Sequence, residues 1–117
     1  MTAANYEITV EAGTTWQLVL TLYDSSNALI DLTNYSARMM VRDSPTGNVT
    51  YMSLTTVALG GITLGGVAGT ITIDRSATQT SALKFTAGVY DLEIQSSTGE
   101  VTRVLQGDFI VSPEVTR

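Results

Sequence analysis

The sequence predicts an all-β fold, an antiparallel β-sandwich of about seven to nine short strands, on three observations. Apolar and polar residues alternate with a period of two through most of the chain. Clusters of Gly, Asp, Asn and Ser separate the alternating segments at short intervals, as turns do. Nineteen threonines suit a pleated surface, where β-branched side chains pack well. The 117 residues suffice for one hydrophobic core, so we expect a single domain over 1–117.

The first half of the chain predicts three strands, over 6–10, 16–23 and 36–42, with a turn at 24–27 and a loop at 43–48. The alternation assigns one face of the second and third strands to the core: Trp16, Leu18, Leu20, Leu22, Ala37, Met39 and Val41. The side chains between them face outward, because successive residues of a strand point to opposite sides.

The second half predicts strands over 49–54, 62–64, 69–74, 88–95 and 101–111. Leu92 and Ile94 are expected on the core-facing side of the strand over 88–95. One or two helical turns are expected within 74–83, where Ser76 is placed to cap the helix. Gly107 lies inside the last strand, a position that predicts a β-bulge.

The segment Thr86–Leu92 reads T-A-G-V-Y-D-L and predicts a turn followed by a strand. Gly88 lets the backbone bend, and Tyr90 begins the alternation. A tyrosine in this place is typical of the immunoglobulin-like sandwich, where its ring is buried and its hydroxyl bonds to backbone a few residues upstream. We therefore expect an immunoglobulin-like sandwich with Tyr90 buried and its hydroxyl bonded near Thr86.

The composition narrows the classes of function. The chain has no Cys and no His, which excludes disulfides and removes the commonest metal ligands and the commonest general base. The net charge of −5 makes nucleic acid and anionic membranes poor partners, because phosphate binding needs clustered Lys and Arg. We expect no membrane span and no secretory signal peptide. The ends, over about 1–5 and 112–117, lack a core-building alternation and are expected to be flexible in the isolated domain.

The sequence contains no recognisable catalytic, metal-binding or cofactor-binding constellation. Asp91 and Glu93 lie on one face of one strand, whereas a glycosidase places two carboxylates across a cleft. The glycines between 60 and 69 lack the lysine of a phosphate-binding loop. We expect a non-enzymatic chain without a cofactor. A sugar-binding platform built from Trp16 and Tyr23 remains an alternative. Trp16 is in register with Leu18, Leu20 and Leu22, however, which favours a place in the core.

Outward side chains predict a surface for a partner. Val19, Tyr23 and Met40 are apolar residues on the non-core faces of their strands, and together with Met52, if it too faces outward, they would form an exposed apolar patch, which marks an interaction site. In the immunoglobulin topology the strands over 36–42 and 88–95 pair. Arg38 and Arg42 are therefore expected on one outer face with Asp91 and Glu93.

Five segments carry a resemblance to a known class of proteins. They read D-L-T-N-Y-S-A-R-M-M-V-R (31–42), G-G-I-T-L (60–64), G-T-I-T-I (69–73), G-V-Y-D-L-E-I (88–94) and V-T-R-V-L-Q-G-D-F-I-V-S-P-E-V-T-R (101–117). Together they resemble small structural proteins of tailed bacteriophages, and the immunoglobulin-like N-terminal domains of phage upper-baseplate and fibre-anchoring proteins.

The resemblance implies a non-enzymatic virion component that docks onto other virion proteins, as an adaptor in the tail, baseplate or neck. It also implies a homo-oligomer in the assembled particle, with neither nucleic acid nor membrane as a partner. A capsid decoration protein and a stand-alone carbohydrate-binding sandwich remain the alternatives. The residues expected to carry docking are Val19, Tyr23, Arg38, Met40, Arg42, Glu114 and Arg117.

Overall fold

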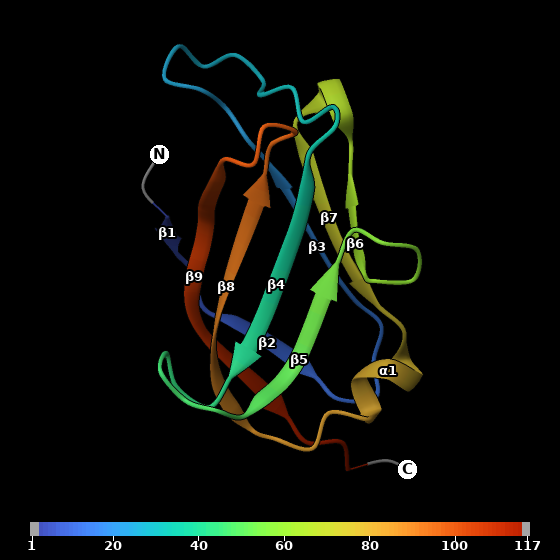
Figure 1. Ribbon diagram of the computed structural model, residues 1–117. Helices are drawn as coiled ribbons and strands as arrows, with labels where there is room; N and C mark the ends of the chain where they lie inside the picture. The colour runs from blue at the N-terminus through green and yellow to red at the C-terminus, as the bar shows by residue number, and fades with distance from the viewer. Residues whose placement is uncertain (1–2, 116–117) are drawn as a thin grey trace.

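The computed structural model describes residues 3–115, which form a sandwich of two β-sheets (Figure 1). The larger sheet has six strands and the smaller has three within these residues. The elements, in chain order, are β1 (Ala4–Asn5), β2 (Ile8–Glu11), β3 (Trp16–Thr21), β4 (Ser36–Arg42), β5 (Thr50–Thr55), β6 (Ile62–Leu64), the 3₁₀ turn η1 (Gly66–Ala68), β7 (Thr70–Arg75), α1 (Ala77–Ser81), β8 (Ala87–Gln95) and β9 (Val101–Ser112). The predicted all-β class is confirmed.

The strand order is that of an immunoglobulin-like sandwich. The larger sheet runs β1-β9-β8-β4-β5, with β2 also on β9, and the smaller sheet runs β3-β7-β6. The chain crosses between the sheets after β2, β3, β5 and β7, as it does in that fold. One detail differs from the expected antiparallel pattern: β1 and β2 pair with β9 in parallel, through Ala4↔Leu105 and Ile8↔Phe109. The first segment of the chain therefore covers the edge that β9 would otherwise expose.

The core lies between the two sheets, and the predicted faces are confirmed. Met39 and Leu92, at the middle of the larger sheet, are 1% and 0% exposed. On the opposite side Trp16, Leu18 and Leu20 of β3 point toward the core but are only partly buried. The ring of Trp16 meets Phe109 edge to face, with ring centroids 5.7 Å apart, so Trp16 belongs to the core rather than to a sugar platform.

The short helix α1 begins at Ser76 because of a capping box. The Ser76 hydroxyl accepts a hydrogen bond from the Gln79 backbone N–H (3.2 Å), and the Gln79 side chain accepts one from the Ser76 N–H (2.8 Å). Thr80, fully buried, donates its hydroxyl to the Thr14 carbonyl at 2.7 Å. This bond attaches the helix to the turn between β2 and β3.

Tyr90 is buried, as predicted, but the predicted hydrogen bond near Thr86 is wrong. Its hydroxyl donates to the carbonyl oxygen of Tyr6, at 2.6 Å. Tyr90 lies opposite Gly107 on β9, and the Tyr6 backbone crosses over Gly107 from the far side. The ring therefore reaches past β9 to the N-terminal segment. Burial, together with the nearby Tyr6, raises the pKa of Tyr90 to about 12.

Two glycines serve a different purpose from the one predicted. Gly88 lies inside β8 rather than at a bend, and a Cβ there would sit 2.7 Å from the Arg42 carbonyl oxygen. A Cβ on Gly107 would sit 2.5 Å from the carbonyl oxygen of Tyr6. The register shift between β8 and β9 falls instead beside Leu92 and Glu93, which pair with Leu105 and Arg103. Both glycines permit close approach of another backbone, and Val104 is the extra residue of the bulge.

The ends of the chain contribute more structure than their sequences suggest. Ala4 and Asn5 form β1, and Ser112 is the last residue of β9, where it pairs with Glu11. The Ala12 backbone N–H also donates to the Ser112 carbonyl, at 2.9 Å. The segments predicted to be flexible therefore include residues that belong to strands, because their partners are distant in the sequence.

Candidate interaction surface on the outer face of the larger sheet

The strand registers place twelve outward side chains of the larger sheet in three rows that each cross β9, β8, β4 and β5. The first row contains Arg103, Glu93, Arg38 and Thr55; the second Gln106, Asp91, Met40 and Ser53; the third Asp108, Val89, Arg42 and Thr50. We call this set the outer grid. The pairing of β4 with β8 confirms the prediction that these two strands lie side by side.

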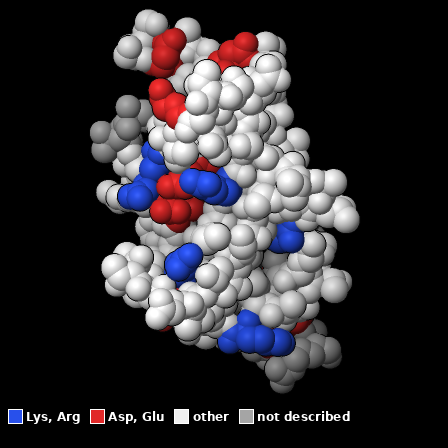
Figure 2. Space-filling model, viewed as in Figure 1, with Lys and Arg blue, Asp and Glu red and all other residues white. Residues whose placement is uncertain are grey.

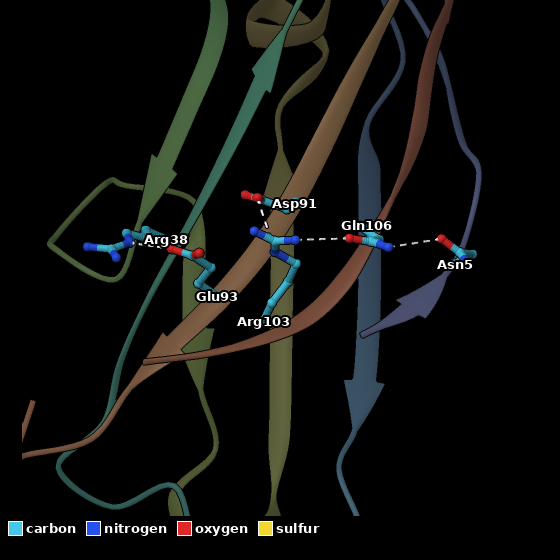
Figure 3. Close-up of polar contacts among 6 residues, drawn as sticks. All are labelled: Asn5, Arg38, Asp91, Glu93, Arg103 and Gln106. Carbon is cyan, nitrogen blue, oxygen red and sulfur yellow. Dashed lines mark hydrogen bonds and ion pairs between the residues drawn. The ribbon is translucent and has the colours of Figure 1, made fainter. Parts of the chain in front are cut away.

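Two groups of polar contacts lie on the outer grid, and one of them reaches the N-terminal strand β1 (Figure 3). Arg38 Nε lies 2.8 Å from Glu93 Oε1, and Arg103 Nε lies 3.4 Å from Asp91 Oδ2. A second contact of Arg103 joins its Nη1 to the side-chain oxygen of Gln106, at 3.2 Å. Gln106 in turn donates to Asn5 Oδ1 at 3.3 Å. These contacts orient side chains of four strands, β1, β4, β8 and β9, on one surface.

Asp91 is a partly buried acidic residue in the second row of the outer grid. Partial burial raises the pKa of Asp91 above its ordinary value, and the neighbouring carboxylate of Glu93 adds to the rise. Arg103, Arg38 and Arg42 oppose it through their positive charges. The repulsion between Asp91 and Glu93 on β8 is therefore offset by arginines on the two neighbouring strands, Arg38 on β4 and Arg103 on β9.

The outer grid is electrically balanced, unlike the protein as a whole. Three of the six basic residues of the chain lie in it, all arginines, beside three of the eleven acidic residues. The whole net charge of −5 thus belongs to the rest of the chain. Figure 2 shows this face with acidic atoms at its centre, basic atoms on either side of them, and largely uncharged atoms around the group.

A shallow hollow of about 540 Å³ lies over the outer grid. Its walls include Met40, Arg42 and Asp91 of the outer grid, together with Pro45 of the loop after β4 and Asn5 of β1. Apolar and charged groups thus meet on its floor. Such a surface can receive the side chains of another protein, with an apolar contact at Met40 and charged hydrogen bonds around it.

The structure brings only part of the predicted docking set together. Arg38, Met40 and Arg42 lie in one column of the outer grid. Of the acids expected beside Arg42, Asp91 instead contacts Arg103, and the Arg42 guanidinium donates to the Gly47 carbonyl at 3.2 Å.

The other predicted docking residues lie elsewhere. Val19, 53% exposed, faces outward from the smaller sheet, and Tyr23, 54% exposed, follows β3 in an isolated bridge to Leu29. The Glu114 carboxylate lies against Gly13, and Arg117 lies outside the described residues. Met52 is half-buried against the core rather than outward, because it lies two residues from the buried Leu54 and so on the same side of β5.

Sequence reasoning missed Arg103, Gln106, Asp108 and Asn5. The bulge at Val104 changes the parity of β9, so that Arg103 and Gln106 point to the same side although they are three residues apart. The available signal was the pair Val104-Leu105, two adjacent apolar residues between Arg103 and Gln106, both of which are buried.

Over residues 3–115 the acidic side chains form no group of three or more that is suited to hold a metal ion. Within the same part of the chain, the helices are too short and too polar to cross a bilayer. A search with models of protein families found no match to this chain, and a search of curated proteins found no significant match.

Proposed function

We propose that this chain is a non-enzymatic structural component of a tailed phage particle, a docking module of the tail, baseplate or neck, and that it docks through the outer grid. The observation that carries the docking role is a set of preformed polar contacts on one charge-balanced face: the Arg38–Glu93 ion pair, and beside it the contacts that run from Asp91 through Arg103 and Gln106 to Asn5. The place in a phage particle rests on the resemblance of the five sequence segments described above.

The chemistry of the outer grid supports recognition of another protein. Arginine is enriched at protein interfaces, because its planar guanidinium makes several directed hydrogen bonds and is weakly hydrated. The contacts of Arg38 and Arg103 already restrict their rotamers in the free domain, which reduces the entropy lost on binding. Met40, 38% exposed, lies between Arg38 and Arg42 on β4 and supplies an adaptable apolar contact.

The two carboxylates on this face are better suited to binding than to catalysis. Glu93 pairs with Arg38, and Asp91 pairs with Arg103, so each carboxylate is matched with a cation. They are adjacent on β8 rather than placed across a substrate. A carbohydrate platform needs aromatic rings beside its polar groups, and the twelve positions of the outer grid contain none. Docking is therefore favoured over sugar binding, whether the module lies in the tail or on the capsid.

The test is incorporation into particles. The chain should be found by mass spectrometry in tailed-phage particles purified on a density gradient from cells that make it. Met40→Glu, which puts an unpaired carboxylate beside Asp91, should lower the amount per particle at least about tenfold. Thr63→Glu, on the outer side of the smaller sheet, is the matched control and should leave it unchanged. Absence of the wild-type chain from purified particles would overturn the virion role, and equal loss from both variants would overturn the assignment to the outer grid.

A further inference from the structure

We infer that the partner seated on the outer grid is a second copy of this chain, in a face-to-face dimer with a twofold axis parallel to the strands and between β8 and β4. The inference rests on the docking role proposed above and names the occupant of that surface. It follows from the order of charges in the three rows.

A twofold axis in this position reverses each row over itself. Glu93 of one copy then faces Arg38 of the other, and Asp91 faces Met40. In the third row of the same two central strands, Val89 faces Arg42. The outer columns, β9 and β5, face each other in the same way: Arg103 meets Thr55, Gln106 meets Ser53 and Asp108 meets Thr50. Each charged residue thus faces an opposite charge or an uncharged side chain, as a self-complementary interface requires.

The perpendicular axis fails the same requirement. An axis across the strands through the second row would place Arg38 over Arg42 of the other copy and Asp91 over its own counterpart. Like charges in contact are strongly unfavourable at an interface. The positions of the charges therefore select one of the two simple ways to stack this sheet on itself.

The dimensions of the face suit a dimer. The domain measures 45 × 28 × 24 Å, so its broad side offers room for the roughly 800 Å² per partner of a standard interface. Two twisted sheets pack face to face with their strands within about 30° of each other, which keeps the central columns in contact while the corners diverge. β8 and β4, which carry the Arg38–Glu93 pair, are those central columns. In the dimer two such pairs meet beside the axis as a group of four alternating charges.

Charge reversal of this pair provides the test. Arg38→Glu presents two carboxylates next to each other, and Glu93→Arg presents two guanidinium groups. Each variant alone should dissociate at least about tenfold more readily than the wild type, because like charges now face each other across the axis. An equimolar mixture of the two variants should form a heterodimer, because the carboxylates of one copy then face the guanidinium groups of the other.

The measurement is sedimentation velocity at several protein concentrations and at two salt concentrations, with Lys84→Glu as a control for the same change in net charge. The wild type and Lys84→Glu should dimerise alike, less tightly at high salt. A wild type that stays monomeric at about 100 µM would overturn the inference. So would single variants that still dimerise, or a mixture of variants that stays monomeric. Because this test uses the isolated protein and the test of docking uses particles, a monomer found in particles would refute the dimer and leave the docking role standing.

Discussion

The central strands of the larger sheet and the edge strand of the smaller sheet follow the same alternation, but their core-facing side chains are buried to different extents. In the larger sheet, Met39, Val41 and Leu92 are 1%, 0% and 0% exposed, because β4 and β8 have neighbours on both sides. In the smaller sheet β3 is an edge strand, and its core-facing residues Trp16, Leu18 and Leu20 stay partly exposed. The smaller sheet has three strands, whereas β1 and β2 widen the larger sheet beyond β9.

The outer faces differ as well. The outward residues of β3 and β7 pair as Gln17↔Asp74, Val19↔Thr72 and Thr21↔Thr70, so this face is mostly uncharged. The outer grid carries six charged residues joined partly by ion pairs. The same β-pattern therefore yields one face suited to directed contacts and another of small polar side chains. The wider sheet provides the candidate docking surface, whereas the core includes fully buried residues of both sheets, among them Ile71 and Ile73 of β7.

The difference in burial predicts unequal costs of the same deletion. Leu92→Ala removes a fully buried side chain from the middle of the larger sheet, and we expect it to lower the free energy of unfolding by about 4 kcal/mol. Leu20→Ala, on the edge strand β3, should cost about 2 kcal/mol, because solvent already reaches that side chain. Urea unfolding followed by tryptophan fluorescence measures both. Equal costs would show that the edge strand β3 is packed as tightly as the central strand β8.

The widening of the larger sheet depends on Gly107. Gly107→Ala places a methyl group against the Tyr6 carbonyl, where the obstacle is backbone, and should cost about 2 kcal/mol. Gly99→Ala is the control: its φ of +93° disfavours a side chain, but nothing lies within 4 Å of the new methyl. That variant should cost about 1 kcal/mol. Thermal unfolding compares the two, and amide exchange of β1 and β2 should accelerate in Gly107→Ala alone.

Tyr90→Phe tests the hydrogen bond that holds the N-terminal segment. It removes the donor to the Tyr6 carbonyl and should cost about 1 kcal/mol at neutral pH. Because the pKa of Tyr90 is raised to about 12 in the folded state, its contribution is present below the ordinary value near 10 and is lost as the pH rises through about 12. Urea midpoints from pH 8 to 12 should therefore fall less steeply in Tyr90→Phe. Tyr23→Phe, which alters an exposed ring, is the control and should match the urea midpoint of the wild type at neutral pH.

The smallest expected effects are changes in Tm when one aspartate is replaced, either Asp91 in the outer grid or Asp24 in the turn after β3. Burial raises the pKa of Asp91, so its ionised form disfavours folding at neutral pH, and Asp91→Asn should slightly raise the Tm at pH 7. Hydrogen bonds from Ser26 and Ala28 lower the pKa of Asp24, so Asp24→Asn should lower the Tm at pH 7. Both differences should shrink as the pH falls below 4, where the carboxylates are protonated. If both variants raised the Tm at pH 7, or both lowered it, the predicted difference between Asp91 and Asp24 would be wrong.

Local patterns in the sequence were enough for much of the fold. The strands over Ser36–Arg42 and Ile62–Leu64 have the bounds that alternation and flanking turns predict. Ser76 caps α1, the one α-helix of the described residues, as predicted from its position near the start of the expected helical turns within 74–83. The core faces of β3, β4 and β8 follow from period two alone. The pairing that brings Arg38 to Glu93 follows from the immunoglobulin-like order once Tyr90 suggests it.

Tertiary structure decided the features that depend on partners far apart in the chain. The parallel strands β1 and β2, the bond from Tyr90 to a residue 84 positions away, and the crossing of Tyr6 over Gly107 all join the two ends of the sequence. The bulge at Val104 has the same character, since it turns Arg103 and Gln106 to the face that Asp91 occupies. Alternation specifies which face of a strand is apolar, because it is a property of adjacent residues. The partner strand, and the register in which its charges meet, are specified only when the two sheets close over one core.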